Sequence, residues 1–288
     1  MSVRLIDHLR SLGLDGRTAR EALASGKVRV DGVPVADGGR EVEPASISYS
    51  PSHPRLVPGR DPVLLHQDPA LAVLYKPSGW LAVPAPHRSD TNMLAFAGKL
   101  LGGVLPVHRL DEGTSGLMMV ARSLRAQELL KEMFEEHRLE RRYLAIARGQ
   151  VSPDLRTVRS HLQRDRGDRL RGSVPRGEEV PADAKEAITE LRGLEPLQGA
   201  TLVEARLQTG RTHQVRIHLA ESGHPILGDP LYADAHSARH FPRLALHAAV
   251  LSFRHPLTGQ ELTFQAPLAD DMESWRRDHP QRAPRRSR

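Results

Sequence analysis

One short stretch of the sequence collects most of the residue types that carry out acid–base or nucleophilic chemistry. It reads His108-Arg109-Leu110-Asp111-Glu112-Gly113-Thr114-Ser115-Gly116-Leu117 and leads into an apolar segment. A carboxylate that enters a core beside an arginine must be paired, because an isolated buried charge is very costly. Asp111 is therefore either one half of a structural ion pair or a carboxylate held ionised as a nucleophile or base. The residues of this stretch alone leave both interpretations open.

The serine of the same stretch does not indicate a hydrolase. Gly113-Thr114-Ser115-Gly116 resembles a nucleophile elbow, but the Gly-x-Ser-x-Gly pattern fails because residue 117 is leucine. We expect the two hydroxyl groups to hydrogen-bond the backbone of the loop.

A second polar stretch follows a Thr-Gly turn and extends from Leu207 to Leu219. Its charged and imidazole side chains are Arg211, His213, Arg216 and His218. A zinc site needs three or four converging ligands, and two histidines five residues apart do not stack on one helix face. We therefore predict no metal site here, and expect Arg211 to reach the carboxylate of Asp111.

An aromatic residue follows two arginines in Arg141-Arg142-Tyr143-Leu144-Ala145. A lone tyrosine on a strand is usually a half-buried core residue. A ring beside basic groups can also stack on a nucleobase. Both interpretations of Tyr143 remain open at this level.

Composition narrows the class of protein. The chain of 288 residues has no cysteine, which excludes disulfide frameworks, zinc ribbons and thiol nucleophiles. It contains no apolar run of roughly 18 residues, no signal-peptide pattern, no glycine-rich phosphate loop and no dinucleotide fingerprint. We predict a soluble, cytoplasmic protein, a monomer by default.

The net charge of +6 is concentrated at two places. Seven arginines lie in residues 155–176 and six in residues 276–288, whereas residues 1–50 are neutral. The planar guanidinium suits phosphate oxygens, although a GC-rich genome produces the same bias. Both segments are candidates for gripping a nucleic acid, and a solvated, disordered surface is the alternative.

Hydrophobic periodicity predicts an α+β fold with a mixed, largely antiparallel sheet. The predicted strands are Leu71–Tyr75, Gly116–Ala121, Tyr143–Arg148, Lys185–Arg192, Thr201–Leu207, Leu244–Phe253 and Glu261–Phe264. The predicted helices are Thr91–Leu101, Ser123–His137 and Asp270–Asp278. Thr212–Ser222 fits either period, and we assign it to a helix that ends before Gly223.

The chain divides into a small and a large domain. Residues 1–50 predict two helices, Leu5–Leu12 and Arg17–Ser25, followed by a hairpin around Asp31-Gly32. The proline-rich residues 51–62 predict a linker. Residues 63–275 then form the large domain, and residues 276–288 a basic, flexible tail.

Taken together, the polar stretches resemble the RluA family of pseudouridine synthases. His108–Leu117 is similar to that family's catalytic signature, and Thr209–His218 to its later arginine motif. Further similar segments are Lys76–Gly79, Arg142–Ala145, Gly223–Tyr232, Arg243–Ala248 and His255–Gly259. The resemblance covers about residues 62–272, with every motif in order.

The resemblance implies an enzyme that isomerises uridine in RNA with no cofactor and no metal. Asp111 would act at the sugar, either by attacking the anomeric carbon or by removing an adjacent proton. Arg211 would pair with Asp111, and Tyr143 would stack on the uracil. The target uridine would be extruded into the pocket. The residues predicted to contact RNA in this domain are His108, Arg109, Lys76, Arg216 and Leu246.

Residues 1–50 resemble the S-four-type RNA-binding module, named for a protein of the small ribosomal subunit. The similar segments are Arg17–Arg20 and Gly26–Gly32. We predict RNA contacts for Arg17, Arg20 and Lys27. Related enzymes for large-subunit ribosomal RNA often carry this module. Large-subunit ribosomal RNA is therefore the expected substrate.

Three alternatives remain at this level. The substrate could be a transfer RNA, or the chain could be a non-catalytic RNA-binding protein that retains the fold. A metal-dependent hydrolase would use His213, His218 and His224.

Overall fold

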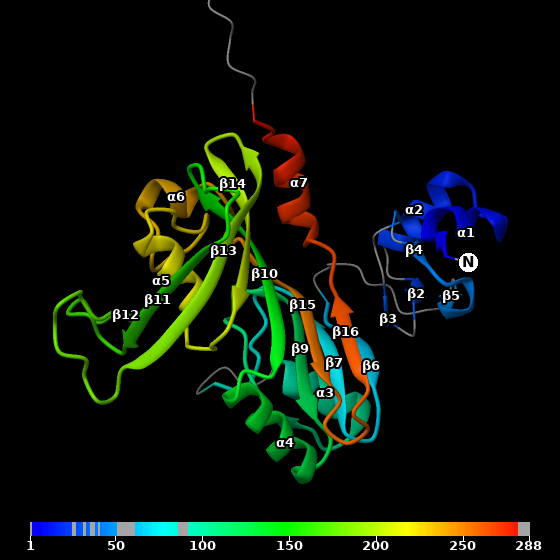
Figure 1. Cartoon of the computed structure of the whole chain (residues 1–288), viewed down its shortest axis with the longest axis horizontal. Helices are drawn as coiled ribbons and strands as arrows, with labels where there is room; N and C mark the ends of the chain where they lie inside the picture. The colour runs from blue at the N-terminus through cyan, green and yellow to red at the C-terminus, as the bar shows by residue number, and fades with distance from the viewer. Residues whose placement is uncertain are drawn as a thin grey trace, which may run out of the picture. The chain divides into compact units, whose positions relative to one another are not determined.

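The structure, a computed structural model, describes residues 2–24, 27–30, 33–34, 38–39, 41–50, 61–85 and 92–281. Within it the chain forms two compact units. The first comprises Met1–Glu132 and Ala249–Asp270, and the second comprises Met133–Ala248 and Asp271–Arg288. Figure 1 labels the helices and strands of both units. Most of the predicted linker 51–62 lies outside the described residues.

The first fifty residues contain a small core of their own. Its elements are β1 (Val3–Arg4), α1 (Leu5–Ser11), α2 (Gly16–Ala24), β2 (Val28–Val30), β3 (Val33–Pro34), β4 (Glu41–Val42), the 3-10 helix η1 (Pro44–Ser46) and β5 (Ile47–Tyr49). Strand β1 pairs with β4, and β2 lies between β3 and β5. Leu5 and Leu9 are one helical turn apart and are buried with Leu23 and Val28. The Asp31-Gly32 turn of the predicted hairpin lies outside the described residues.

The larger part of the first unit is built on two fully buried strands. Strand β7 (Leu71–Lys76) pairs antiparallel with β9 (Ser115–Ala121), and every residue of both is buried. Such continuous apolar runs are typical of strands covered on both faces. Strand β6 (Val63–Gln67) pairs with β7, and β8 (Leu105–Pro106) pairs with β9. Strand β15 (Leu246–Arg254), whose C-terminal part belongs to this unit, forms a hairpin with β16 (Glu261–Gln265).

Two helices complete this part of the chain. Helix α3 (Met93–Leu101) begins after Asn92, whose side-chain oxygen accepts a hydrogen bond from the Ala95 N–H at 2.9 Å. This is a regular N-terminal cap. Helix α4 (Leu124–Glu135) follows β9 directly.

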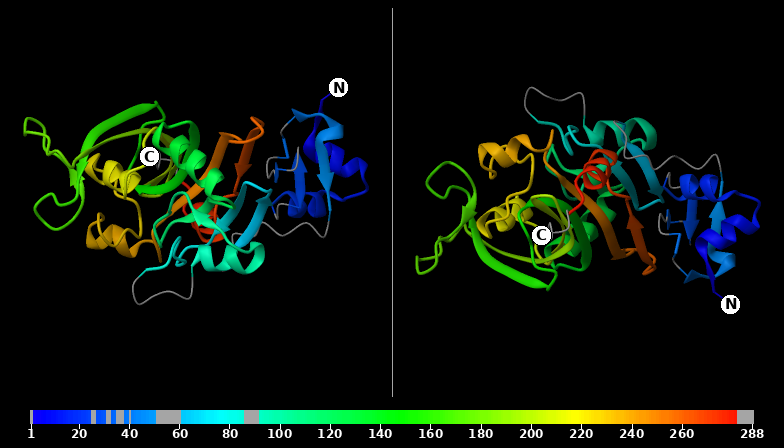
Figure 2. Two further views of the ribbon diagram at one scale, coloured as in Figure 1. Left: turned by 90° about the horizontal axis from the view of Figure 1, so that it is seen from below. Right: turned by 90° about the horizontal axis from the view of Figure 1, so that it is seen from above.

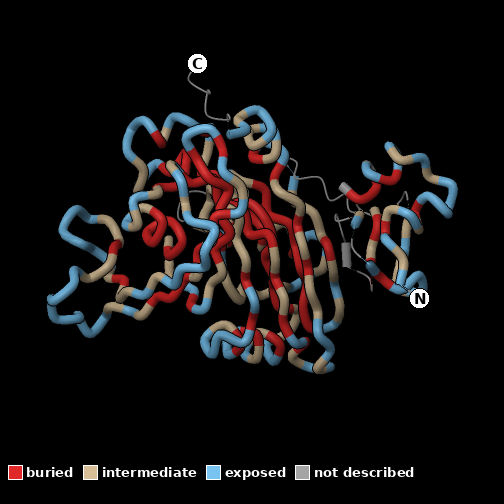
Figure 3. Tube along the Cα trace, turned by 45° about the horizontal axis from the view of Figure 1, so that its top comes forward, coloured by how far each residue is buried: buried red, intermediate tan, exposed pale blue. Residues whose placement is uncertain are grey.

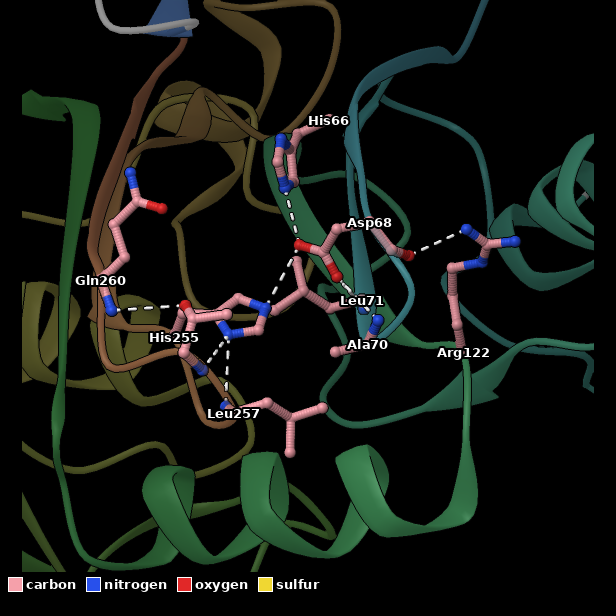
Figure 4. A network of polar contacts seen from close by, with 9 residues as sticks. His66, Asp68, Ala70, Leu71, Arg122, His255, Leu257 and Gln260 are labelled. Atoms are coloured by element: carbon pink, nitrogen blue, oxygen red, sulfur yellow. Dashed lines mark hydrogen bonds and ion pairs between the residues drawn. The ribbon is translucent and has the colours of Figure 1, made fainter.

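A polar network joins two turns of the first unit (Figure 4). Asp68, between β6 and β7, accepts hydrogen bonds from two backbone N–H groups of its own turn. Its Oδ2 also lies 2.9 Å from His66 Nε2 and 3.3 Å from His255 Nε2. Burial acts to raise the pKa of Asp68, but the bonds from His66 and from the turn, together with the charge of His255, lower it. The β6–β7 turn and the start of the β15–β16 turn are therefore held together by one carboxylate.

The second unit contains five antiparallel strands in the order β12-β11-β13-β14-β10. Their bounds are Gly172–Ser173 for β12, Arg156–Gln163 for β11, Lys185–Leu197 for β13, Ala200–Leu207 for β14 and Leu139–Arg148 for β10. The helices are α5 (Gln214–Glu221), α6 (Ala235–Arg239) and, from its second residue on, α7 (Asp270–Asp278). Ile217 of α5 packs against Leu162 and Ala187, which places α5 on the β11–β13 face.

Figures 1 and 2 show β13 and β14 as a long hairpin beside β10, with the loops around β12 extending from one end. In Figure 3 the buried positions run along the strands, whereas these loops are exposed. The second unit thus presents a rigid sheet with a polar extension.

The predicted α+β class with a largely antiparallel sheet is confirmed. Each predicted strand and each predicted helix of the large domain coincides with an observed element to within a few residues. The ambiguous segment Thr212–Ser222 is helical, as α5.

In the large domain, the elements that the sequence did not predict are β6, β8, β11, β12 and α6. Strand β11 has Leu162 as its single buried residue, so no apolar alternation marks it. Helix α6 has five residues, too few to show a period, and it depends on Asp234 capping two backbone N–H groups. No helix among the described residues has the length and apolar character needed to span a membrane.

The boundary predicted for the tail falls inside a helix. Helix α7 continues to Asp278, so Arg276 and Arg277 belong to it rather than to a flexible tail. Arg276 forms ion pairs with Glu195 at 2.6 Å and with Glu273 at 2.7 Å. Residues 282–288 lie outside the described residues.

Candidate active site

Asp111 lies in the loop that leads into β9, and a buried lysine fastens this loop to the turn after β7. Lys76 has no exposed surface. Its Nζ donates hydrogen bonds to the carbonyl oxygens of Pro77 at 3.0 Å, Trp80 at 2.6 Å and Glu112 at 3.0 Å. An ammonium group has three N–H donors, so three backbone carbonyls satisfy it completely.

Two further hydrogen bonds connect the same segments. Ser78 Oγ donates to the Gly113 carbonyl at 2.8 Å, and the Gly79 N–H donates to the Glu112 carbonyl at 2.9 Å. The two residues that follow Asp111 are thereby held from one side. Such support fixes the backbone from which the Asp111 side chain projects.

The residues around Asp111 alternate between buried and exposed positions. Leu110 is buried and anchors the loop, whereas Arg109 is exposed and Asp111 is half-buried. His108 Nε2 accepts a hydrogen bond from the Met119 N–H of β9 at 2.9 Å. Arg109 is therefore presented at the surface, where RNA can reach it.

Lys76 was predicted to contact RNA, and the structure shows its side chain engaged within the protein, so that contact stays a prediction. Its ammonium is buried and bonded to three carbonyls of its own unit. A phosphate could reach it only if this loop opened. Lys76 positions the Asp111 loop.

In the second unit, Arg211 lies in a turn that a buried glutamine fastens to β13. Gln214 Oε1 accepts hydrogen bonds from the Arg211 N–H at 2.9 Å and from Thr209 Oγ1 at 2.8 Å. Gln214 Nε2 donates to the Ile188 carbonyl at 3.0 Å. The Arg211 side chain is held as well, because its Nε donates to the Glu186 carbonyl at 2.9 Å.

Sequence analysis did not identify Thr209 or Gln214 as site residues. The available signal was a polar residue, Gln214, in the first turn of a helix that is buried over most of its length; Gln214 itself is 2% exposed. Buried amides are hydrogen-bonded, and the nearest polar groups in sequence are those of the Arg211 turn.

Arg216, also predicted to contact RNA, is engaged by a carboxylate of its own unit, and its RNA contact stays a prediction. Its Nε and Nη2 donate to the two carboxylate oxygens of Asp229, both at 2.8 Å. The Arg216 side chain is 5% exposed and that of Asp229 is fully buried. The guanidinium also lies over the ring of Tyr232, 5.1 Å from its centroid. Arg216 therefore forms a core ion pair.

The three histidines of the hydrolase alternative are each bonded within the protein. His213 Nδ1 lies 2.9 Å from the Tyr232 hydroxyl, and His224 Nδ1 lies 3.0 Å from a backbone carbonyl. Both ring nitrogens of His218 have hydroxyl partners, Thr189 at 2.8 Å and Ser160 at 3.0 Å. Within the described part of the chain, no three acidic or histidine side chains are arranged to hold a metal ion.

Tyr143 and Leu246 lie on strands of the second unit. Tyr143 is half-buried on β10, opposite Ala205 of β14. Leu246 is buried at the start of β15. Asp111 belongs to the first unit, so its predicted meeting with Arg211 and Tyr143 stays a prediction.

The two basic surface regions are ordered where they are described. Residues 155–176 contain β11 and β12 and so are not a disordered surface. Arg159 pairs with Glu186, and Arg166 with Asp168, each at 2.8 Å. In the N-terminal region Arg17 and Arg20 are exposed one turn apart on α2, and Lys27 is partly exposed before β2.

Comparison with known proteins identifies the class to which this fold belongs. The structure resembles that of human RNA pseudouridylate synthase domain containing 1, with a TM-score of 0.61 over 72% of this chain and 83% of that one, at 24% identity. The family model for RNA pseudouridylate synthases matches residues 70–221.

Closer relatives share more of the sequence. The chain is 39% identical to the ribosomal large subunit pseudouridine synthase D of Zymomonas mobilis, over 73% of this chain and 70% of that protein. It is also 39% identical to an uncharacterised RNA pseudouridine synthase of Bacillus subtilis, with the same coverage. The chain belongs to the RluA family of RNA pseudouridine synthases and is accordingly an isomerase with an RNA substrate.

Proposed function

We propose that this protein converts specific uridines of large-subunit ribosomal RNA to pseudouridine, with Asp111 as the catalytic carboxylate and with no cofactor or metal. The observation that carries the role of Asp111 is the support of its loop by Lys76, Ser78 and Gly79. A reacting carboxylate must be held close to its productive geometry, and a rigid loop provides that. The names of several relatives support ribosomal RNA as the substrate.

The reaction is an isomerisation, so the atomic composition of the nucleotide is unchanged. The bond from the anomeric carbon to uracil N1 breaks, the base turns, and a bond to C5 forms. C5 loses its proton and N1 gains one. Asp111 acts at the sugar, by attack on the anomeric carbon or by removal of the adjacent proton.

The other predicted site residues have supporting roles. Arg211 balances the charge of Asp111, Tyr143 stacks on the uracil, and Leu246 lines the opposite side of the base. Arg109, exposed beside Asp111, holds the extruded nucleotide or occupies the space that it leaves. His108 fixes the backbone on the other side of Arg109 through its bond to Met119.

The N-terminal region supplies a second contact with RNA in this proposal. Arg17 and Arg20 share one face of α2, because residues three apart are neighbours on a helix. Lys27 and the exposed arginines of residues 155–176 extend the positive surface. These residues contact phosphates and so contribute affinity more than sequence selectivity.

The test uses ribosomal RNA with tritium at uracil C5, incubated with the pure protein and a chelator. We expect the wild type to release tritium, and the Asp111→Ala and Asp111→Asn variants to lose at least about a thousandfold in rate. The matched control is Asp154→Asn, which should keep the wild-type rate. Asp154 is exposed, its carboxylate accepts a hydrogen bond from Ser152 Oγ, and its backbone N–H donates to the same atom.

Each outcome decides one part of the proposal. Release by the Asp111 variants at the wild-type rate would assign Asp111 a structural role. Tritium release from transfer RNA but not from ribosomal RNA would show that the reaction is correct and that the substrate is a transfer RNA. Mapping the modified position would identify the target uridine.

A further inference from the structure

A buried arginine of the second unit has part of its guanidinium without a protein partner. Arg141, at the start of β10, is 7% exposed. Its Nε and Nη2 atoms are buried, and no acceptor among the described residues bonds to either. The only aromatic ring under the guanidinium within the described chain is Phe134, 5.4 Å away. A buried charged donor without an acceptor is costly, which suggests a role outside the folded chain itself.

The unbonded atoms form the edge of arginine that binds oxyanions. In Arg216 this Nε and Nη2 edge holds both oxygens of Asp229, at 2.8 Å. In Arg243 the same edge holds both oxygens of Asp271, at 2.6 Å. Two parallel bonds of this type match a carboxylate or a phosphate. Arg141 offers the same edge to a ligand.

Arg141 is one of the residues that line a cavity of about 490 Å³ in the second unit, while its Nε and Nη2 atoms are themselves buried. Glu140, Glu186 and Glu190 also line it, but none of them bonds to Arg141 Nε or Nη2. These glutamates have partners of their own at 2.8 Å, namely Arg142, Arg159 and Gln208 respectively. The cavity therefore has room for a ligand, and its acidic groups are already engaged.

The cavity lies beside the predicted catalytic residues of this unit. Arg141 and Tyr143 project from the same face of β10, because alternate residues of a strand do so. Burial lowers the pKa of Arg141; the nearby Tyr143 acts to raise it and the nearby Arg211 lowers it further. The turn before Arg211 lies against the guanidinium: a Cβ atom on Gly210 would fall 2.5 Å from Arg141 Nη1.

We propose that the Nε and Nη2 edge of Arg141 binds a phosphodiester group of the RNA substrate, next to the uridine on which Tyr143 stacks. An RNA chain carries one such oxyanion per nucleotide, and bidentate contacts to them set the register of the bound strand. The RNA substrate is a property of the family, and the position next to Tyr143 rests on the function proposed above. Arg141 is thus a positioning residue for the nucleotide chain.

The first experiment compares Arg141→Met with Arg125→Met, which removes an exposed arginine of α4 whose partner, Glu128, lies 3.7 Å away. Affinity for a short fluorescein-labelled single-stranded RNA with one central uridine is measured between about 50 and 200 mM salt. We expect Arg141→Met to weaken binding about tenfold and to reduce the salt slope by about one phosphate contact. Arg125→Met should change neither quantity.

Thermal unfolding without RNA separates a binding role from a structural one. Removing an unpaired buried charge should leave the midpoint of Arg141→Met unchanged or higher. A lower midpoint would indicate a structural arginine and overturn the proposal. Arg141→Lys, which keeps the charge but not the fork, should bind RNA with an affinity between those of the wild type and Arg141→Met.

A panel of RNAs locates the contact. In each RNA one phosphate near the uridine is replaced by an uncharged methylphosphonate. One position should weaken binding by the wild type about tenfold and leave Arg141→Met unaffected, because the two changes remove the same interaction. Full additivity at every position would overturn the proposal. The RNA-binding measurements need no turnover. If the wild type released no tritium from ribosomal RNA, ribosomal RNA would be refuted as the substrate, but the contact between Arg141 and the phosphate would still stand on the binding data.

Discussion

The two units each bury a long basic side chain next to predicted catalytic residues, and they do so differently. In the first unit Lys76 is surrounded by three carbonyl oxygens, one of which belongs to the Asp111 loop. In the second unit Arg141 lies against the Arg211 turn with two donors that no described residue satisfies. Lys76 lies in a family motif and Arg141 directly precedes one, yet their bonding predicts opposite roles. Lys76 supports the protein, and Arg141 supports the substrate.

Two other buried basic side chains show how the cost of burying a positive charge is avoided elsewhere in this protein. Arg216 is neutralised by Asp229. His218 has hydroxyl partners only, and burial lowers its pKa to about 4, so it stays neutral in the folded protein. A buried base is therefore surrounded by acceptors, paired with an anion or deprotonated. Arg141 fits none of these three descriptions.

The largest effect on stability is expected at Lys76. Lys76→Met leaves the carbonyls of Pro77, Trp80 and Glu112 without their donor, which should lower the unfolding free energy by about 4 kcal/mol. The Asp111 loop should loosen as well, so tritium release should fall even at a temperature where the variant is folded. Urea unfolding measures the first effect, with Lys99→Met, an exposed lysine of α3, as the control. A loss of unfolding free energy below about 1 kcal/mol would mean that Lys76, like Arg141, is not needed to stabilise the fold.

A somewhat smaller loss is expected at Arg216. Arg216→Met leaves Asp229 buried with only its two backbone donors, Leu231 and Tyr232, and should cost about 3 kcal/mol in urea unfolding. The salt slope of RNA binding should equal that of the wild type, in contrast to Arg141→Met. A reduced slope in a folded Arg216→Met protein would show that Arg216 contacts RNA despite its ion pair. Arg239→Met, an exposed arginine of α6, is the matched control.

The last effect develops only as the pH falls and concerns His218. Its pKa in the folded protein, about 4, is below the unfolded value near 6.5. The unfolded state therefore binds more protons in this window, and stability falls as the pH decreases from about 6.5 to 4, by up to about 3 kcal/mol. Urea unfolding across this range should show a flatter profile for His218→Gln than for the wild type. His240→Gln, an exposed histidine after α6, should retain the wild-type profile, and equal slopes for all three proteins would refute the assignment.

Much of the fold could be predicted from local pattern. The apolar runs of β7 and β9 are visible in the sequence because their strands are buried on both faces. Strand β11 was missed because only one of its eight residues is buried, and its order comes from pairing with β13. Local sequence does not record such long-range support.

In the candidate site, too, some features follow from local sequence and others depend on residues far away in the chain. Motif spacing was enough to select Asp111, Arg211 and Tyr143, because the chemistry needs those residue types within short segments. Family resemblance assigned RNA contacts to Lys76 and Arg216, whereas the structure shows both side chains buried and bonded within the protein. The partners that decide their roles lie 36 and 13 residues away in the chain, as the Glu112 carbonyl and the Asp229 carboxylate.

The sequence by itself determined the class of fold, the family and the residues most suited to the chemistry. Only the tertiary structure decided which of the basic residues are available to RNA. The physical reason is that charge is a property of the residue, whereas the cost of burying it depends on acceptors brought together by folding. Lys76 has such acceptors around its whole ammonium group, and Arg141 has a bidentate edge that no described residue occupies.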